Sequence, residues 1–271
     1  MTIQEAAMSK VLIAAHRGVA GGNIPCNSYP AFQGALRQGA DIIELDISRS
    51  KDGVLYVFHP GTEPIFLGID TLLKELDSHE IDKLRLRNQD LTVTEYGVPL
   101  LRDIFRELKG RCYINLDKFW SCPADISALV REMGMQDQVI IKTSVSKENF
   151  DRVEDVAWDL PYMAIVRETD NATEEMLRRK VRYVGVEALF TSEDAPVAQT
   201  EYLQSMRDKK LVAWVNAIIY NYKTVLAAGH SDDLAVGWDM DKGWGWLVDR
   251  GFNIIQTDWT LMLRQYLDQK G

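Results

Sequence analysis

The feature that most constrains this chain is a regular alternation of short β-rich segments and longer helical segments along its 271 residues. Eight short apolar segments predict strands at residues 11–16, 41–48, 111–117, 138–143, 162–166, 182–187, 211–216 and 253–258. Between them, apolar residues at helical spacing predict helices at residues 28–38, 101–108, 124–133, 148–156, 174–180, 197–208 and 261–269. Strands that alternate with helices indicate a parallel sheet. Eight such units in a chain of about 250 residues are typical of a closed (β/α)8, or TIM, barrel.

A single domain over residues 1–271 is predicted, because no linker rich in Pro, Gly or Ser and no low-complexity stretch divides the chain. One segment breaks the alternation. Directly after the second strand, Asp52 and Gly53 predict a two-residue hairpin that folds the chain back antiparallel. With these two residues at the tip, Asp46 faces His59. Residues from about 60 to 97 then form a small insertion, which we expect to lie over the top face of the barrel.

The formal net charge of −9 argues against nucleic acid as a partner, because a polyanion is repelled unless a basic patch is present. The densest basic cluster, at residues 178–182, is interpreted as a solvated helix end. No apolar run approaches the ~20 residues that span a bilayer, so no transmembrane segment is predicted.

Three cysteines without zinc-site or CxxC spacing favour free thiols in a reducing cytoplasm. The first residues lack the apolar region of a secretory signal, which also favours a cytoplasmic location. A mature secreted form, trimmed of its signal, would look the same. The sequence does not indicate an oligomeric state.

Several chemically useful side chains fall at the C-terminal ends of the predicted strands, where TIM barrels place their active sites. His16 ends the first strand, and Asp117 ends the third. Glu44 and Asp46 share one face of the second strand, because strand side chains alternate with a period of two. With His59 returned by the hairpin, three carboxylates and two histidines are predicted to converge. Buried carboxylates either protonate or hold a cation, and oxygen ligands favour Mg²⁺ or Ca²⁺ over zinc.

Taken singly, these residues also have structural interpretations. A strand-ending histidine is often structural, acidic pairs on strands often face solvent, and Asp117 is suited to cap the next helix. Their joint placement on three strands favours the functional interpretation. Asn27 is interpreted as a helix N-cap. His79 and His230 lie in polar segments without a matching partner and are expected at the surface.

The segment that runs from residue 16 to residue 59 resembles the N-terminal signature of glycerophosphodiester phosphodiesterases. That signature reads HRG, then PENTxxAF, then GAdxiExDvxxTkDGxxVvxHD. The matching residues are His16-Arg17-Gly18; Pro25-Cys26-Asn27-Ser28 with Ala31-Phe32; Gly39-Ala40-Asp41 with Glu44 and Asp46; Lys51-Asp52-Gly53; and His59. Further on, INLDK resembles the family's NxE segment, VAWVN its WTVN strand and GFNIIQTDW its GvDgiiTD strand. The resemblance therefore spans nearly the whole chain.

This resemblance implies a TIM barrel with an insertion after strand two. It also implies hydrolysis of glycerophosphodiesters to glycerol phosphate and an alcohol, with one Mg²⁺ or Ca²⁺ ion. By position, it assigns metal ligation to three carboxylates, acid–base catalysis to two histidines and phosphate binding to an arginine. These residues are Glu44, Asp46 and Asp117; His16 and His59; and Arg17. The sequence does not tell which histidine is the acid and which the base.

Four positions depart from the family pattern. Cys26 replaces the glutamate of PENT, and Pro60 replaces the aspartate after the second histidine. The third ligand, Asp117, is shorter than the usual glutamate by one methylene. Phe119 stands where the family has a lysine, and Lys118 is expected to point to the opposite face of the strand.

Lys142, near the end of the fourth strand, is a candidate replacement for that lysine. We hypothesise that Lys142 points into the barrel and contacts the phosphate; a surface lysine at a strand end is the alternative. Trp214, with Trp244, Trp246 and Trp259, is a candidate wall of the substrate pocket, where an aromatic face could hold a choline-like cation. Core or rim packing is the alternative for these tryptophans.

Three other functions remain open on the sequence. A related lipid phosphodiesterase, similar to a phospholipase D or sphingomyelinase D, would share the two histidines and three carboxylates. A degenerate barrel that only binds phosphate esters or a partner protein is suggested by the departures at Cys26, Pro60 and Phe119. A metal-dependent sugar isomerase or aldolase fits the fold but does not explain His59 on the hairpin.

Overall fold

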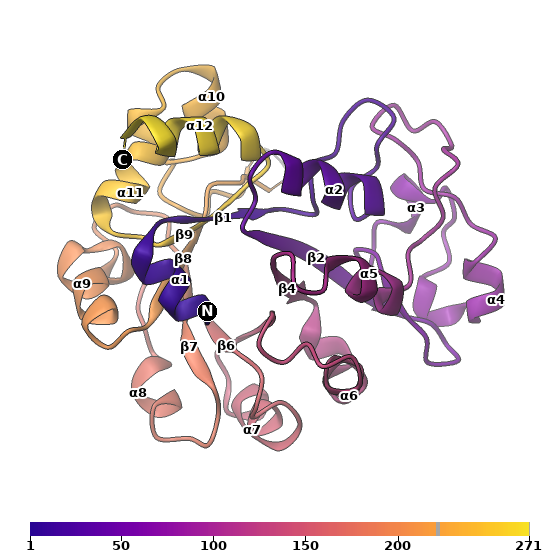
Figure 1. Cartoon of the computed structure of the whole chain (residues 1–271), viewed down its shortest axis with the longest axis horizontal. Coiled ribbons are helices and arrows are strands. Elements are labelled where there is room, and N and C mark those ends of the chain that lie inside the picture. Colours follow the sequence, from indigo (N-terminus) through magenta and orange to yellow (C-terminus); the bar gives the residue numbers. More distant parts are fainter. Residues whose placement is uncertain (221–222, 271) are drawn as a thin grey trace.

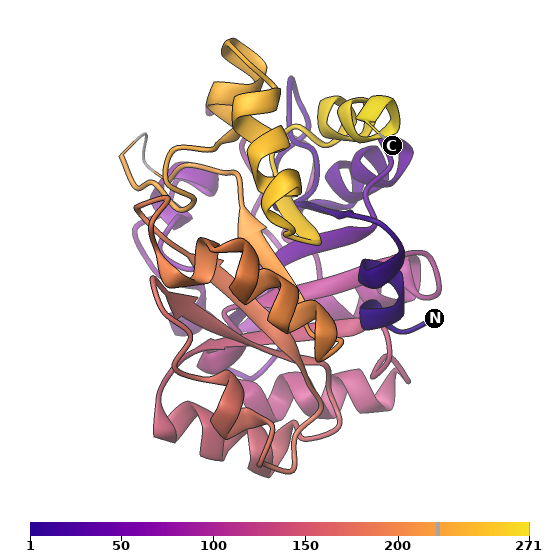
Figure 2. The same cartoon turned by 90° about the vertical axis from the view of Figure 1, so that its left-hand side faces the viewer.

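Eight parallel strands close into a barrel in the computed structural model, which describes residues 1–220 and 223–270 (Figure 1, Figure 2). The barrel strands are β1 (Leu12–Ala15), β2 (Ile42–Arg49), β4 (Tyr113–Asp117), β5 (Val139–Ser144), β6 (Tyr162–Arg167), β7 (Tyr183–Leu189), β8 (Val212–Asn216) and β9 (Ile254–Thr257). Their order is β1-β9-β8-β7-β6-β5-β4-β2, and the pairing of β1 with β2 closes the ring. Each strand lies where the sequence predicted it, with ends that differ by at most two residues. The TIM-barrel prediction is therefore confirmed.

Helices follow most strands and cover the outside of the barrel (Figure 1). The predicted helices are present as α2 (Tyr29–Arg37), α5 (Leu101–Leu108), α6 (Pro123–Glu132), α7 (Lys147–Val156), α8 (Thr173–Met176), α9 (Thr200–Asp208) and α12 (Thr260–Lys270). Helical segments that were not predicted include α1 (Ile3–Ser9), α10 (Asp232–Gly237), a π-helix (Asp241–Gly245) and α11 (Trp246–Arg250). The last three are short and interrupted by glycines, which weakens a helical pattern. Across the described residues, no helix combines the length and apolar character that crossing a membrane requires.

The interior of the barrel is layered, because alternate residues of each strand point inward. The lower layer is apolar and contains Ile42, Ile140, Met163, Val212, Trp214 and Ile254. Helix α1 closes this end by packing Ile3, Ala6 and Ala7 against that layer. The layer above is polar and contains Glu44, Asn115, Lys142, Glu187, Asn216 and Gln256. One end of the barrel interior is therefore apolar, and the other is lined with groups that can bind a polar ligand.

The hairpin after β2 differs from its prediction by one residue. Strand β3 (Leu55–Val57) pairs antiparallel with β2, and Ile47 lies opposite Val57. Asp46 is therefore level with Phe58, whose backbone N–H donates to the carbonyl oxygen of Asp46 (3.0 Å). The predicted pairing of Asp46 with His59 is wrong because the loop has three residues, not two.

The three-residue loop is fixed by its first flanking residue. The N–H of Ser50 donates to the carbonyl of Val54 (2.9 Å), and the Ser50 hydroxyl accepts from the N–H of Val54 (2.8 Å). Gly53 ends the loop with a φ of +93°, a left-handed conformation that a glycine adopts without strain.

The insertion at residues 60–97 lies beside the barrel, beyond α2 and α5 (Figure 1). It contains α3 (Glu63–Phe66), a 3-10 turn (Leu73–Glu75) and α4 (Ser78–Ile81). Its own apolar cluster packs Leu73, Ile81 and Leu86 against Tyr56 and Phe58 of the hairpin. None of its described residues lines the cavity that holds Glu44 and Asp117, but Gln89 lines a neighbouring cavity that also includes His16 and Arg17. The segment therefore lies beside the barrel and borders its top face at one point.

Strand β7 contains an irregularity that positions its functional residue. The register with β6 shifts between Tyr162 and Met163, whose partners are Tyr183 and Gly185. Gly185 has a φ of +151°, and a Cβ atom there would lie 2.0 Å from the carbonyl oxygen of Val212. Close approach of β7 to β8 at this point therefore requires glycine. The shift leaves Glu187, two residues later, pointing into the barrel.

Gly185→Ala is expected to lower the free energy of unfolding by about 2–3 kcal/mol, because the added methyl meets backbone that cannot move aside. Urea denaturation measures the change. Gly237→Ala is the matched control, since a Cβ at Gly237 meets nothing within 4 Å. The control should change stability by less than about 1 kcal/mol. Equal stability of the two variants would contradict the close approach.

Candidate active site

A cavity of about 560 Å³ opens at the C-terminal end of the barrel. The polar layer of the interior forms its floor, and residues just beyond the strand ends form its rim. His16, Glu44, His59 and Asp117 all line this one cavity. The structure thus brings together at one mouth residues that are up to about a hundred positions apart in the sequence.

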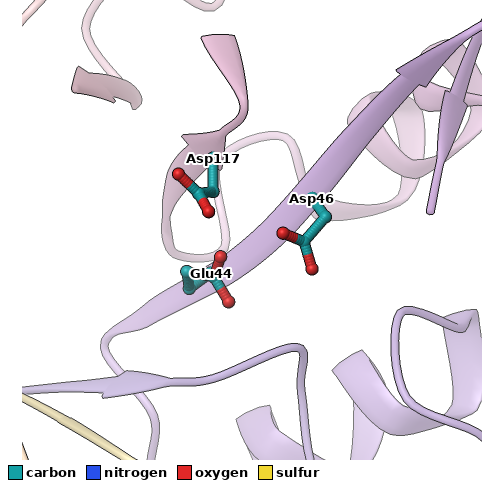
Figure 3. A group of neighbouring side chains, drawn as sticks. All are labelled: Glu44, Asp46 and Asp117. Atoms are coloured by element: carbon teal, nitrogen blue, oxygen red, sulfur yellow. The ribbon is translucent and has the colours of Figure 1, made fainter. Parts of the chain in front are cut away.

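Three carboxylates meet on two neighbouring strands. Glu44 and Asp46 lie on β2, and Asp117 ends β4 directly opposite Asp46 in the strand register. Figure 3 shows the three side chains pointing toward one another, and one oxygen atom of each lies within 4.8 Å of the others. Glu44 and Asp46 are almost fully buried. The predicted carboxylate cluster is therefore present.

The carboxylate of Asp46 is held from one side by the segment between β1 and α2. Asn27 donates its amide to Oδ2 of Asp46 (2.9 Å) and accepts from the backbone N–H of Asp46 (3.3 Å). Arg17 forms an ion pair with the same oxygen (Nε–Oδ2 2.9 Å), and its backbone N–H donates to Glu44 (2.9 Å). The other oxygen of Asp46, Oδ1, is buried and has no hydrogen-bond partner.

Asn27 is thus not the helix cap that the sequence suggested. Ser28 caps α2, and its hydroxyl accepts from the N–H of Ala31. Both Arg17 and Asn27 have left-handed backbones, with φ of +56° and +53°. Such conformations are uncommon outside glycine and turn these two side chains toward the carboxylates.

His16 is oriented by a carboxylate that the sequence analysis did not single out. Its Nδ1 lies 2.8 Å from Oδ1 of Asp258, just beyond β9. Burial alone would lower the pKa of His16, but the hydrogen bond to Asp258 and the charge of Glu44 outweigh it and raise that pKa. Asp258 ends the last predicted strand, so the strand-end rule could have found it.

Asp258 is held in turn by the buried carboxylate of Asp232. Asp232 accepts hydrogen bonds from the backbone N–H of Asp258 (2.8 Å), the hydroxyl of Thr257 (2.7 Å) and the indole of Trp244 (2.7 Å). Burial raises the pKa of Asp232 to about 6. The orientation of His16 therefore depends on α10, which carries Asp232.

His59 lies near the free side of Asp46, with its Nε2 3.9 Å from Oδ1. Burial lowers the pKa of His59, and the nearby cations Arg17 and Lys118 act in the same direction. Its Nδ1 is buried without a hydrogen-bond partner. This agrees with Pro60, which offers no side-chain acceptor to orient the ring.

Lys118 belongs to the site, contrary to the prediction that it points to the opposite face. Its φ of +62° ends the alternation of β4 and turns its side chain inward. Nζ lies 2.6 Å from Oδ2 of Asp117 and 3.9 Å from Oδ1 of Asp46. Although burial acts to raise the pKa of Asp117, the Lys118 ammonium lowers it overall. Phe119 is fully buried in the core.

Lys142 points into the barrel and lines the cavity. Its ammonium pairs with Glu187 (Nζ–Oε2 2.9 Å) and lies over the ring of Trp214, 3.1 Å from the centroid. Asn216 completes the group by donating to Glu187 (2.5 Å) and accepting from the Trp214 indole (2.9 Å). Burial lowers the pKa of Lys142 even though Glu187 opposes this.

The predicted pocket wall of tryptophans is not formed as expected. Trp214 is fully buried beneath Lys142, and its ring face is covered by that ammonium, so it does not line the cavity. Trp244 is buried against Asp232. Trp259 is half exposed and lines a second, neighbouring cavity.

Trp246 stacks on His230, with ring centroids 3.8 Å apart. The prediction that His230 is a surface residue is wrong, because its ring is buried between Trp246, the carbonyl of Lys242 (2.6 Å) and Glu193 (3.0 Å). His79 is exposed, as predicted.

The donor set of the carboxylate cluster fits a hard divalent cation. Carboxylate oxygens are the ligands that Mg²⁺ and Ca²⁺ prefer. Burial and the charge of Asp46 raise the pKa of Glu44 to about 8, the behaviour of acidic groups that lack a counter-charge. The unpartnered Oδ1 of Asp46 offers a ready ligand atom. Glu44, Asp46 and Asp117 are therefore the residues that could hold a metal ion.

Comparison with known proteins gives one match to a family and several named relatives. Residues 162–267 match a family described as a domain of unknown function, DUF4996. The chain is 55% identical to a glycerophosphodiester phosphodiesterase of Bacillus altitudinis over 140 residues, which cover 48% of this chain and 57% of the relative. A further curated relative bears the same name, and another is named a probable glycerophosphodiester phosphodiesterase. The chain spans less than two thirds of the length of the curated relatives that it matches.

Solved structures share the fold over nearly the whole chain. A glycerophosphoryl diester phosphodiesterase from Parabacteroides distasonis has a TM-score of 0.80 at 18% identity and covers 98% of this chain and 92% of its own. An Oleispira antarctica phosphodiesterase in complex with the product sn-glycerol-3-phosphate has a TM-score of 0.69 at 16% identity and covers 97% and 99%. Glycerophosphodiester phosphodiesterase is thus the name that recurs among these curated relatives, and the solved structures, at 18% and 16% identity, show that the fold is shared.

Cation binding to this cluster is expected to release a proton, because Glu44 is protonated below pH 8 in the metal-free protein and must lose that proton to act as a ligand. The apparent affinity should therefore rise with pH up to about 8 and then level off. Calorimetric titration with Mg²⁺ or Ca²⁺ in buffers of different ionisation enthalpy measures the effect. About one proton should be released at pH 7 and close to none at pH 9. Equal proton release at the two pH values would contradict the shift.

Proposed function

We propose that this chain belongs to the glycerophosphodiester phosphodiesterase family and hydrolyses glycerophosphodiesters to glycerol phosphate and an alcohol, as its relatives and structural neighbours suggest. We infer that the reaction depends on one divalent cation, Mg²⁺ or Ca²⁺, and uses two histidines for proton transfer. The observation that carries the proposal is the convergence of His16, His59, Arg17, Glu44 and Asp117 on one cavity, with Asp46 completing the carboxylate cluster beside it. The product named for the Oleispira antarctica structure supports a small phosphate ester as ligand.

A phosphodiester is anionic, so attack on phosphorus requires that negative charge on the phosphate oxygens be compensated. Arg17 lies at the cavity beside Asp46 and can contribute its guanidinium to a phosphate oxygen. Lys118 and Lys142 bring two further ammonium groups to the same cavity. A cation held by Glu44, Asp46 and Asp117 would add Lewis-acid stabilisation of the developing charge.

Proton transfer is assigned to the two histidines. An attacking hydroxyl must lose a proton, and the leaving alcohol must gain one; histidine titrates in the right range for both. In the proposed sequence, a glycerol hydroxyl attacks phosphorus, the bond to the alcohol breaks, and water then opens the cyclic phosphate. His16, held by Asp258, and His59, near Asp46, both line the cavity; they follow β1 and β3, so one could accept a proton while the other donates one.

A lipid phosphodiesterase is the second candidate, and one observation favours it. A second cavity, of about 710 Å³, meets the first at His16 and Arg17. Its walls include Val19, Trp259 and Leu261, and the last two are about half exposed. An apolar chain attached to the phosphate could lie there. Side-by-side assay of glycerophosphocholine, glycerophosphoethanolamine, lysolipids and sphingomyelin separates the two candidates.

Phosphodiesterase activity should fall by at least about a hundredfold in His59→Ala, because a proton-transfer group is removed. His79→Ala, which removes an exposed histidine outside the cavity, is the matched control and should keep full activity. Alcohol release from glycerophosphoethanolamine measures both. Excess EDTA should abolish wild-type activity, and Mg²⁺ or Ca²⁺ should restore it. Full activity of His59→Ala, or of the wild type in EDTA, would overturn the mechanism.

Lys142 is proposed to contact the phosphate from the floor of the cavity, and a pair of variants tests this. Lys142→Met leaves Glu187 without its counter-charge, so both stability (about 3 kcal/mol) and kcat/KM should fall. Lys142→Met with Glu187→Gln removes both charges and should recover most of the stability. If the ammonium binds phosphate, the double variant should remain at least about tenfold less active than the wild type. Wild-type activity in the double variant would assign Lys142 a structural role only.

A further inference from the structure

The cations that border the cavity differ in one respect. Arg17 pairs with Asp46, Lys118 with Asp117, and Lys142 with Glu187. Arg167 also lines the cavity, yet none of the ion pairs among the described residues involves it. Its guanidinium is therefore a positive charge in the site that no carboxylate of the described chain compensates.

The place of Arg167 follows from the topology of the barrel. Ile165 and Arg167 lie two apart on β6 and both line the cavity, as inward-facing positions of one strand do. In the ring of strands, β6 is four steps from β1 in either direction. Arg167 therefore stands across the mouth from His16 and Arg17, which follow β1. A phosphodiester held at Arg17 would extend one substituent toward Arg167.

Among the described residues, the half of the cavity around Arg167 has no free negative charge. Glu187 is its lining carboxylate, and both oxygens are engaged, one by Lys142 and one by Asn216. Glu168, next to Arg167 in the chain, accepts two hydrogen bonds from Thr191 and does not line the cavity. A cationic head group such as choline would find a positive charge there and no carboxylate to pair with. An anionic group would find an arginine ready to bind it.

We propose that Arg167 selects glycerophosphodiesters whose alcohol carries a second anionic group, a carboxylate or a phosphate. The planar guanidinium binds either oxyanion through two parallel hydrogen bonds. This inference rests on the proposed function, because it concerns the alcohol that the same reaction releases. The proposal specifies that this alcohol is anionic, whereas the family resemblance does not indicate its charge.

Two matched substrate pairs test the proposal. Glycerophosphoserine differs from glycerophosphoethanolamine by one carboxylate, and a glycerophosphoinositol phosphate differs from glycerophosphoinositol by one phosphate. For the wild type, kcat/KM should be about tenfold higher for the anionic member of at least one pair, which is about 1.4 kcal/mol. A preference in the first pair identifies a carboxylate as the group that Arg167 binds, and a preference in the second identifies a phosphate.

The preference should depend on Arg167 itself. In Arg167→Gln the ratio within the preferred pair should fall to about one, mainly through the KM of the anionic substrate, and in Arg167→Glu it should reverse. Arg178→Gln is the matched control, because it removes an equal charge from an exposed helix end and should keep the wild-type ratio. Added salt should weaken the wild-type preference. Thermal unfolding of each variant confirms that it is folded.

The failures of the two proposals are distinguishable. If the wild type hydrolyses none of the four diesters with Mg²⁺ or Ca²⁺ present, the proposed function itself fails. If it hydrolyses them without a preference for the anionic members, or if Arg167→Gln keeps the wild-type ratio, the selection by Arg167 is overturned and the proposed function stands.

Discussion

The buried carboxylate of Asp46 is the constraint on which the rest of the site depends. A charge in the low-dielectric interior must be compensated or neutralised, and here the compensation is one-sided. Arg17 and Asn27 hold one oxygen, and the other is buried near Glu44 and Asp117 without a hydrogen bond. The left-handed backbone conformations at Arg17 and Asn27 turn these two side chains toward Asp46, where they compensate its charge. The carboxylate cluster thus shapes the loop before α2 as well as the cavity.

Most of the architecture could be predicted from the sequence, because strands and helices with different periods alternate so regularly. The hairpin at β2–β3 could not be predicted in its register. Asp52-Gly53 is compatible with both a two-residue and a three-residue loop, and the hydrogen bonds of Ser50 decide for the longer one. Such a decision depends on a single side chain and has no periodic signal in the sequence.

Strand-end position and the motif were enough to predict the carboxylates and histidines of the candidate site. Side chains alternate along a strand, so Glu44 and Asp46 were predicted to share one face of β2, and Asp117 was predicted at the end of the neighbouring strand. The structure brings the three together. Lys118 was missed because a positive φ breaks that alternation. The prediction that Trp214 walls the pocket was wrong for another reason. The alternation of side chains predicts that a residue points into the barrel, but not how far it lies from the mouth. Trp214 lies one layer below the cavity floor, where Lys142 covers it.

The barrel interior is divided into an apolar lower layer and a polar upper layer, and mutations in the two layers have different effects. Those below affect stability, and those above affect ligand binding. The lower layer, sealed by α1, carries packing shared by β1, β2, β5, β6, β7, β8 and β9, and Tyr113 of β4 packs against it. Changes there act on every strand at once. The side chain of a rim position such as Arg167 belongs to none of the hydrophobic clusters and to none of the ion pairs among the described residues. A protein built in this way can exchange the residues that meet its ligand, and so acquire new preferences over evolutionary time, while its scaffold remains unchanged.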